Sequence, residues 1–521
     1  MSRMRQFGLW GIAALLLIMA CGSSTASASD LLTLPARTRV ETEPGSKRWH
    51  SLTKPLEWKA EETAIVVCDM WDNHWCENSA RRVGEMAPHM NRVIEAARQK
   101  GVMIIHCPSD TMEFYKDTPQ RKLAMSAPIV ETVIPLERWC RIDPQKEGPQ
   151  LPIDDSDGGC DCEGPVKNYR AWSRQHAAIE IMEQDAITDS AEAFYLMKQK
   201  GIHNVIVMGV HTNMCVLGRP FSIRQMVRQG QNVVLMRDMT DTMYNPAKAP
   251  FVNHFTGNDL VVEHIEQYWC PTITSSVFTG EPAFRFPDDK RPHVAVVCSE
   301  PEYQTELSLP KFALEHLGRD FKVSYLFADA TDNNLLPGCE VLADADLLLL
   351  SMRRRTLPPE QLNVFRSYIA AGKPVLGIRT ANHAFCLRDQ SAPEGRADWR
   401  EFDQDVIGGS YTNHWGYGPK TNVSIVDEQA AHPILQDLDA SRLVGNGSLY
   451  KVSPLRESAQ ALLIGTIPDA ASEPIAWVNR RSDGGTTFYT SFGHIDDFSE
   501  PAFTKLLTNA AHWLTRKEEQ R

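Results

Sequence analysis

The chain has 521 residues, of which 42% are hydrophobic. This length exceeds what one compact core usually holds and the apolar content suffices for packed cores, so two or three globular domains are expected and bulk disorder is excluded. The formal net charge of −12 argues against a nucleic-acid-binding protein, because such proteins need clustered basic residues.

The first 29 residues have the features of an export signal. Arginines within residues 1–5 precede an apolar run over 9–20 that is too short to span a bilayer comfortably. Cleavage after residues 26–28, Ala-Ser-Ala, would release a periplasmic or extracellular protein. Residues 18–21, Ile-Met-Ala-Cys, resemble instead a bacterial lipobox, which would anchor the protein through a lipid on Cys21. Both interpretations stay open, and no later run reaches the ~20 apolar residues of a membrane helix.

Residues 30–277 have the pattern of a first α/β domain. Short apolar runs typical of buried parallel strands alternate with segments of helical periodicity. This alternation predicts right-handed crossovers and a mainly parallel sheet with helices on both faces. The expected strands cover 63–69, 102–106, 204–209 and 232–236, and the expected helices cover 86–97, 191–200 and 215–229.

A long irregular stretch interrupts this domain between Pro108 and Tyr169. It is rich in proline, glycine and acidic residues, and a loop of this length inside a domain is usually functional, so we expect a lid. Its acidic part, 154–159, has the oxygen content of a calcium loop but lacks the twelve-residue pattern and the terminal glutamate, which favours a solvated lid.

Four cysteines lie in polar, loop-like sequence: Cys76, Cys140, Cys160 and Cys162. In an oxidising compartment a disulfide among them, or free thiols, is the favoured interpretation, although the sequence does not give the pairing. A zinc site at Cys160-Asp161-Cys162 is the sharper alternative, but one intervening residue is unusual for a structural zinc motif.

Residues 278–292 are proline-rich and charged without periodicity, which is typical of an interdomain linker. A second alternation of strands and helices follows over 293–518. The chain is therefore expected to be an α/β protein with two doubly wound, mainly parallel-sheet domains. The expected strands cover 293–298, 321–327, 346–351 and 374–378, and the expected helices cover 309–317, 358–371 and 503–514.

Cys215 lies between a buried strand and a helix, at the edge where open α/β sheets form their sites. The helix N-terminus favours a thiolate there, and its backbone N–H groups are suited to hold an oxyanion. Asp69 ends the first strand in the same way, so neighbouring strands would bring its carboxylate to the same edge as a general base. The structural alternatives are a packed core thiol at Cys215 and a turn or helix cap at Asp69.

Three segments of this domain carry a family resemblance: Ile65-Val66-Val67-Cys68-Asp69, Val207 to Val216 with its glycine–x–x–threonine–x–x–cysteine core, and Asn232 to Asp238. Through them residues 63–275 resemble the isochorismatase-like cysteine hydrolases, three-layer α/β sandwiches that often self-associate. The resemblance implies that Cys215 is the nucleophile and Asp69 its base. It also implies a cis peptide at Val210–His211, with the amides of His211 and Cys215 as oxyanion donors.

The third catalytic residue of that family, a lysine, is missing from its expected place around 179–185. Lys167 is the nearest upstream lysine, and His176 is a second candidate for its role. The site is therefore either a variant of the family's triad or one that no longer hydrolyses.

The nicotinamidases of the family bind a metal beside the triad. Here Asp72, His74 and His106 are the residues that would supply ligands, with polar loops as the simpler interpretation. The sequence assigns no cofactor beyond the divalent metal that this alternative would use.

The second domain carries its own resemblance, in segments that contain Arg379, His383, His414, His494 and Asp497. These segments are Gly377 to His383, Gly408 to His414, Glu473 to Trp477, Ser491 to Phe498 and Pro501 to Trp513. They resemble the ThuA-like (trehalose-utilisation) domains, which share the flavodoxin-like layout of class I glutamine amidotransferases. The resemblance implies a link to carbohydrate metabolism.

Arg379 stands where an amidotransferase has its nucleophilic cysteine, and a guanidinium cannot attack a carbonyl, so glutamine hydrolysis is not expected. A cluster of Arg379, His383, His414, His494 and Asp497 would suit a sugar, an anion or a metal. The alternative is that the glycine-rich segments are turns whose histidines cap helices.

Two main functions follow. The first is an exported enzyme, in which a cysteine hydrolase for a small amide-like substrate is joined to a carbohydrate-handling domain. The second is a non-catalytic small-molecule or sugar-binding protein built from two degenerate enzyme folds. A metal-assisted, nicotinamidase-type hydrolase is a third alternative. The expected partners are a small molecule, a carbohydrate and, by family resemblance, a second copy of the chain.

Overall fold

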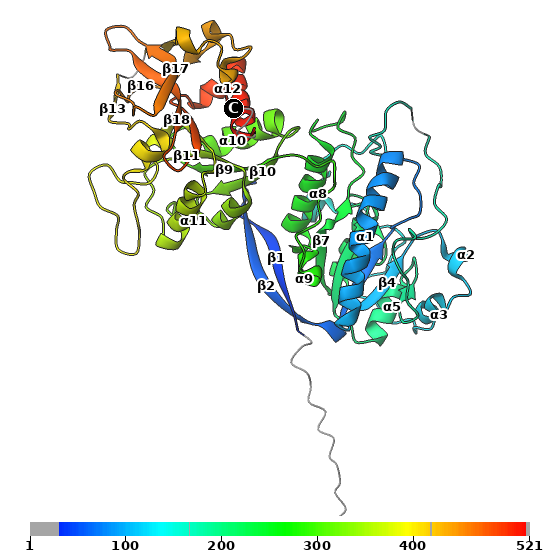
Figure 1. Ribbon diagram of the computed structural model, residues 1–521. Coiled ribbons are helices and arrows are strands. Elements are labelled where there is room, and N and C mark those ends of the chain that lie inside the picture. Colours follow the sequence, from blue (N-terminus) through cyan, green and yellow to red (C-terminus); the bar gives the residue numbers. More distant parts are fainter. Residues whose placement is uncertain (1–30, 166, 417–418, 517–521) are drawn as a thin grey trace, which may run out of the picture.

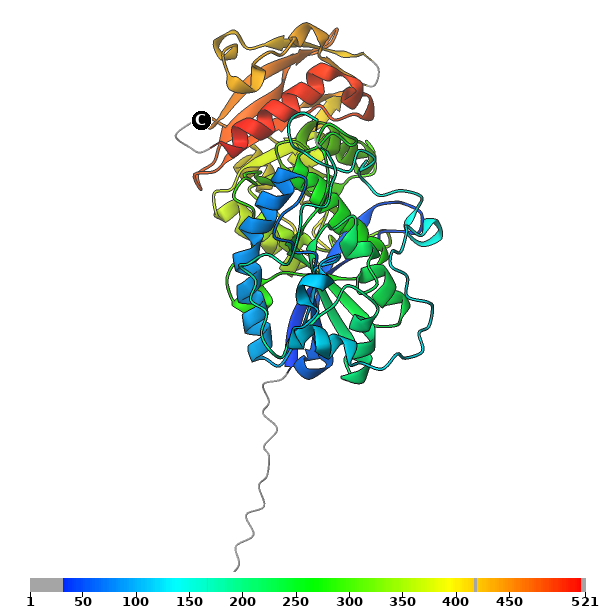
Figure 2. The ribbon, with the colours of Figure 1, turned by 90° about the vertical axis from the view of Figure 1, so that its right-hand side faces the viewer.

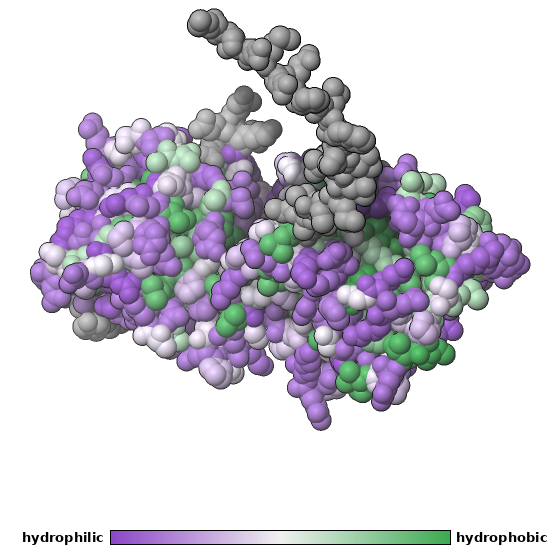
Figure 3. Space-filling view, turned by 90° about the horizontal axis from the view of Figure 1, so that it is seen from below, coloured by the Kyte–Doolittle hydropathy of each residue, from purple (hydrophilic) through white to green (hydrophobic). Residues whose placement is uncertain are grey.

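The structure, a computed structural model, describes residues 31–165, 167–416 and 419–516. The predicted export signal, including Cys21, lies outside these residues. Two α/β lobes follow one another along the chain (Figure 1). Among the residues described, no helix combines the length and apolar character needed to cross a membrane. The face seen from below carries mostly hydrophilic side chains with apolar ones scattered between them (Figure 3).

The first domain is built on an eight-stranded sheet of order β2-β1-β8-β7-β6-β3-β4-β5. Its six strands from β8 to β5 are parallel, as expected from their continuous apolar sequence. They are β3 (Thr63–Cys68), β4 (Met103–Cys107), β5 (Ala186–Ile187), β6 (Asn204–Val210), β7 (Asn232–Asp241) and β8 (Thr272–Ile273).

Helices cover both faces of this sheet. Alternate residues of β3 enter two separate cores, with Val66 in one and Ile65 in the other. The core of Ile65 contains α1 (Glu77–Gln99), and the core of Val66 contains residues of α5 (Glu192–Gln199), α7 (Ile223–Arg228) and α8 (His254–Tyr268). The predicted three-layer α/β arrangement is confirmed.

The predicted helix 215–229 is wrong in one respect, because it is broken in two. α6 (Cys215–Gly218) ends at once, and α7 begins only at Ile223. Pro220 lies in the gap, and a proline has no N–H for the helical ladder. The break leaves Arg219 at the end of a single turn that starts at Cys215.

An N-terminal hairpin, which the sequence analysis did not predict, extends the sheet. β1 (Leu31–Glu41) and β2 (Trp49–Lys59) pair in antiparallel register, and β1 joins β8 at Arg37 opposite Thr272. β2 packs against β10 (Lys322–Phe327) of the second domain. The approach is close at the carbonyl of Ser51, where Gly338 of the second domain has room for no side chain.

The segment predicted as a linker, 278–292, begins inside the short helix α9 (Ser276–Thr279) and continues along the first domain. Phe286 is buried there and stacks on Phe255 of α8. Further contacts between the domains come from Arg319, whose Nε donates to the carbonyl of Phe251, 2.8 Å away.

The second domain has a nine-stranded sheet of order β10-β9-β11-β12-β19-β18-β17-β14-β15. The first five strands are parallel, which confirms the predicted α/β class, and the last four form an antiparallel extension that was not foreseen. The strands are β9 (His293–Ser299), β10, β11 (Leu347–Met352), β12 (Val375–Ile378), β14 (Thr421–Ile425), β15 (Val444–Gly445), β17 (Ala459–Thr466), β18 (Glu473–Arg480) and β19 (Thr486–Thr490).

Three helices support this sheet: α10 (Thr305–Phe312), α11 (Pro359–Ala370) and α12 (Pro501–Thr515). The last of them, predicted from its apolar face, lies along the sheet (Figure 2) and buries Phe503, Leu507 and Leu514 in the core. A small separate pair, β13 (Asn413–Trp415) and β16 (Leu449–Lys451), lies beside the sheet.

Candidate functional site

Asp69 and Cys215 meet at the carboxyl edge of the first sheet, as predicted. β3 and β6 are neighbours with Cys68 opposite Gly209, so the residues that follow each strand emerge together. Asp69 is fully buried, and Ser109 donates its backbone N–H to Oδ1 of Asp69 at 2.7 Å. The Asp69 carboxylate lies close enough to the thiol of Cys215 to raise the pKa of that thiol.

The third member of the site is Arg219, which sequence reasoning missed. Its amide donates to the carbonyl of Cys215, one turn earlier, and its Nε lies 3.4 Å from Oδ2 of Asp69. The guanidinium also interacts electrostatically with the Cys215 side chain. The signal was present in the sequence, since residues four apart lie on one side of a helical turn. Arg219 thus places a positive charge beside both Asp69 and Cys215.

Neither residue predicted as a lysine substitute lies at this site. Lys167 is an exposed residue of the long loop, and the cation that contacts Asp69 is Arg219. The ring of His176 lies beside Gly84 on α1, and its amide donates to the carbonyl of Met70.

The electrostatics of the site favour a thiol at rest. Burial and the adjacent Asp69 carboxylate raise the pKa of Cys215 well above its usual value, against the opposing charge of Arg219. The prediction of a thiolate from the helix N-terminus is thus wrong in direction, because α6 is one turn long and burial outweighs its dipole. Burial also raises the pKa of Asp69, which makes that carboxylate a stronger base.

The peptide bond between Val210 and His211 is cis, as the family resemblance implied. After it the chain turns tightly, and the carbonyl of His211 accepts hydrogen bonds from the amides of Met214 and Val216. Cys215 is the first residue of α6, where an amide has no partner within the helix. This is the local geometry in which the amides of His211 and Cys215 would act as oxyanion donors.

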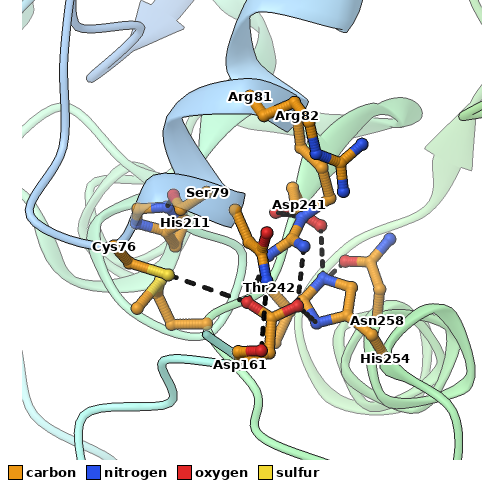
Figure 4. Close-up of polar contacts among 12 residues, drawn as sticks. Cys76, Ser79, Arg81, Arg82, Asp161, His211, Asp241, Thr242, His254 and Asn258 are labelled. Carbon is orange, nitrogen blue, oxygen red and sulfur yellow. Dashed lines mark hydrogen bonds and ion pairs between the residues drawn. The ribbon is translucent and has the colours of Figure 1, made fainter. Parts of the chain in front are cut away.

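The His211 side chain is turned away from this chemistry. Its Nε2 lies 2.6 Å from the hydroxyl of Ser79, and burial lowers the pKa of the imidazole well below its usual value. Beside it, Arg82 forms ion pairs with Asp241 at 2.7 Å and Asp161 at 2.8 Å, and His254 bonds Asp241 at 2.9 Å (Figure 4). This buried network ties the start of α1 to the ends of β7 and the long loop.

The three residues predicted as metal ligands are not brought together. Asp72 accepts from Ser173, His74 accepts the amide of Cys76, and His106 bonds Gln175 and Asp185. Over the described ranges, the three form no common group of ligand atoms. His106 belongs to β4, whereas Asp72 and His74 follow β3, and each of the three has its own hydrogen-bond partners. The nicotinamidase-type metal site stays a prediction.

The long loop covers the site. Cys140 donates its amide to the carbonyl of Gly218 at 2.7 Å, and Asp155 accepts from the side chain of Asn213 at 2.8 Å. Cys215 is left only 7% exposed. A cavity of about 820 Å³ is lined by residues of the long loop, including Trp139, and by Asn213 and Met214, which precede Cys215. Cys215 itself does not line it. The long loop is thus held by hydrogen bonds to residues on both sides of Cys215, Asn213 before it and Gly218 after it.

A second candidate site lies at the edge of the second sheet. A cavity of about 380 Å³ holds three arginines, Arg353, Arg354 and Arg388, close to His383 and His414. Arg353 is paired with Glu302 at 2.8 Å. The arginines at 353 and 354 follow the end of β11 directly, which is the sequence signal that was missed. The remaining lining residues are Glu302, Tyr303, Tyr411, Asn413, Ser448 and Tyr450.

The model of the ThuA family, described as trehalose utilisation, matches residues 293–514. The second domain is similar to ThuA domains. Similar solved structures include a putative ThuA-like protein from Bacteroides uniformis, with 19% identity over 45% of this chain and 95% of that one (TM-score 0.34). A cysteine hydrolase from Pseudomonas syringae has 16% identity over 42% of this chain and 91% of that one (TM-score 0.27). No curated protein matches the chain.

Of the five site residues predicted in the ThuA-like domain, only His383 and His414 line its cavity. The Arg379 guanidinium is buried between the rings of Tyr303 and Tyr450, 4.3 and 4.5 Å from their centres. His494 and Asp497 cap the turn at 495–499, and Asp497 accepts the amides of Gly493 and His494. These two side chains thus make the capping contacts of the structural alternative, and their part in ligand binding stays a prediction.

Proposed function

We propose that the first domain is a cysteine hydrolase for a small amide or a related substrate. The carrying observation is the buried contact of Asp69, Cys215 and Arg219 at the carboxyl edge of the sheet. The features of residues 1–29 support the further proposal that the enzyme is exported, to the periplasm or beyond.

The reaction starts with a thiol and a base in contact. Asp69 takes the proton of Cys215 as the sulfur attacks the substrate carbonyl, and the amides of His211 and Cys215 stabilise the oxyanion. The leaving group departs with the proton held by Asp69, which leaves an acyl-thioester on Cys215. Asp69 then deprotonates a water that attacks the thioester and releases the acid and the free thiol.

Arg219 gives this site a different character from one that contains lysine. A guanidinium keeps its proton at all working pH values, so Arg219 is a fixed charge and not a proton carrier. It opposes the effect of burial on both Asp69 and Cys215. Proton transfer to the leaving group is therefore assigned to Asp69 alone.

A Cys215→Ala variant tests the proposal. Wild type and variant are compared on a panel of small amides and esters, and trapped acyl-enzyme is sought on the peptide that contains Cys215 by mass spectrometry. Cys386→Ala, at a partly exposed cysteine of the second domain, is the matched control. Hydrolysis that is lost in the first variant and kept in the second supports the enzyme. Equal rates of wild type and Cys215→Ala on every substrate would favour the binding protein instead.

For the ThuA-like domain we propose binding of an anionic carbohydrate derivative, such as a sugar acid or a sugar phosphate. The specific support is the convergence of Arg353, Arg354 and Arg388 on one cavity. The family's description as trehalose utilisation supports a carbohydrate. Calorimetry with gluconate, glucose 6-phosphate and neutral glucose is the test, and equal binding of the neutral sugar would refute the role of charge.

A further inference from the structure

We propose that Cys76, Cys160 and Cys162 form a binding site for Zn²⁺, or for a cation of the same soft class, in the first domain. Their sulfur atoms all lie within 4.8 Å of one another. The sulfurs of Cys76 and Cys162 are 3.6 Å apart. Tetrahedral zinc with Zn–S bonds of about 2.3 Å places two thiolate sulfurs about 3.8 Å apart, so the spacing fits a shared cation.

The fourth cysteine of the loop sequence does not belong to this group. The sulfur of Cys140 accepts a hydrogen bond from Arg228, 2.9 Å away, on the opposite part of the loop. The fold therefore brings together three of the four thiols, although Cys76 and Cys160 are 84 positions apart in the sequence. Sequence spacing alone does not show this, because the first ligand precedes a helix and the other two lie far downstream.

Contacts that need no cation hold the two ligand-bearing segments together. Asn78 donates its side-chain amide to the carbonyl of Asp161 at 3.0 Å and its backbone amide to the sulfur of Cys162 at 3.5 Å. Arg82 bonds the Asp161 carboxylate from the next turn of the same helix (Figure 4). Gly159 lets the loop approach closely, since a Cβ there would lie 2.2 Å from the carbonyl oxygen of Met243. The three thiols are thus pre-positioned.

The surroundings act on the charge of Cys76 in both directions. Cys76 is the N-cap of α1, a helix of 23 residues, and the free amides at such an end favour negative charge. Its burial and the Asp161 carboxylate, 3.6 Å from its sulfur, oppose a thiolate, so the cation itself must displace the proton. Each thiol loses its proton when it binds the cation, so three thiolates leave the zinc complex with one net negative charge. Among the residues described, the group contains three ligands. Because Cys160 and Cys162 are partly exposed, a water or a small ligand has access to a fourth position.

This cation site is separate from the proposed cysteine nucleophile. Cys76 donates its amide to Nδ1 of His74, whose ring lies 5.0 Å from that of His211. The side chain of His211 points to Ser79, in the first turn of α1, and not to Cys215. We assign the cation a structural role: it joins the long loop to the start of α1.

Titration with Co²⁺ is the test, because the thiolate-to-cobalt absorption band grows with the number of thiolates bound. The full-length protein is reduced, freed of metal and titrated with Co²⁺, and Zn²⁺ is then added as a competitor. One equivalent of Co²⁺ should bind with the band of three thiolates, and Zn²⁺ should displace it.

Cys76→Ser, Cys160→Ser and Cys162→Ser should each remove about a third of the band and weaken binding by more than the 10–100-fold that loss of an outer-sphere partner typically costs. Cys386→Ser should change neither. If a variant fails to fold, the cobalt titration of the wild-type protein by itself tests the proposal. No thiolate band in wild type, or a Cys76–Cys162 disulfide in protein purified with zinc and without reductant, would overturn the proposal.

Discussion

Arg219 follows Cys215 by one helical turn, and its Nε lies 3.4 Å from Oδ2 of Asp69. Both side chains are shielded, with 11% of the Arg219 side chain and none of the Asp69 side chain exposed. In such an environment a carboxylate and a guanidinium depend on each other, since either one alone would be a buried, unpaired charge.

Replacement of Arg219 should therefore disable the proposed hydrolase. We expect Arg219→Ala to lower kcat/KM on any substrate that wild type hydrolyses by roughly 10²–10³-fold, as loss of a preorganised charge typically does. Arg219→Lys should keep more activity because the charge is retained. Lys167→Ala should match wild type, since Lys167 is exposed. A large loss in Lys167→Ala would show that the lysine and not Arg219 completes the site.

Alkylation of Cys215 by iodoacetamide should become faster as the pH rises, because the pKa of the Cys215 thiol is raised. The thiolate is the reactive form, so the rate should stay low at pH 7 and rise above the usual thiol pKa of ~8.5. Mass spectrometry of the Cys215 peptide over pH 6–10 measures it. A rate that is already maximal at pH 7 would contradict the raised pKa.

Asp69→Asn should change the alkylation rate of Cys215 and the rate of hydrolysis in opposite directions. The Asp69 carboxylate raises the pKa of Cys215, so its removal should lower that pKa and speed alkylation several-fold at pH 8. Hydrolysis should fall at the same time, because the base is lost. Parallel gain or parallel loss of both rates would exclude Asp69 as the base.

The second domain should lose stability as pH rises because of Asp403. Burial raises the pKa of this carboxyl to about 8, against the nearby Arg354. A folded-state pKa above the unfolded value gives stability that is complete below about pH 4 and is lost as pH rises toward 8. Asp403→Asn should therefore be more stable than wild type at pH 8, by roughly 5 kcal/mol, and similar at pH 4.

Unfolding midpoints at pH 4, 6 and 8 test this expectation. Asp405→Asn is the control, because Asp405 is half exposed and paired with Arg456. A wild-type midpoint that rises between pH 6 and 8 relative to Asp403→Asn would contradict it.

Gly209 should tolerate no side chain. Its φ is +113°, and an added Cβ would lie 2.0 Å from the carbonyl oxygen of Cys68 on the neighbouring strand. We expect Gly209→Ala to destabilise the first domain by several kcal/mol, as backbone clashes in a core do. Gly230→Ala is the control: it also has a positive φ, but the space around it is open, so about 1 kcal/mol is expected. Equal unfolding midpoints for the two variants would contradict the crowding argument.

The parts of the site that the sequence predicted are those fixed by strand ends. Asp69 and Cys215 follow buried parallel strands, and such strands end at one edge of a sheet whatever the loops do. Arg219 was missed because the helix that starts at Cys215 was expected to run on to residue 229. In such a helix the residue four positions after Cys215 is one surface residue among others. The break at Pro220 could be read from the sequence, but its effect on the Arg219 side chain could not.

Loops were harder to predict than strands. Cys76 and Cys162 meet because hydrogen bonds of Asn78 and Arg82 set the path of the long loop, and no local pattern encodes that path. The arginines at 353 and 354 are informative only once β11 is known to end before them. The hairpin of β1 and β2 has alternating buried residues such as Leu32 and Leu34, which is the pattern of a half-exposed strand.

That hairpin, together with contacts such as that of Arg319 with Phe251, means that the two lobes are tied at several places and not at one hinge. The first strand pair of the chain packs against β10, while the segment 278–292 enters the second lobe directly. A swing of one lobe about the connecting segment would have to pull the hairpin from β10. The orientation of the Cys215 site relative to the cavity of Arg353 and Arg354 is therefore fixed from both ends of the first domain. If the second domain were expressed alone from residue 293, its outermost strand, β10, would lose the cover of β2 and face water.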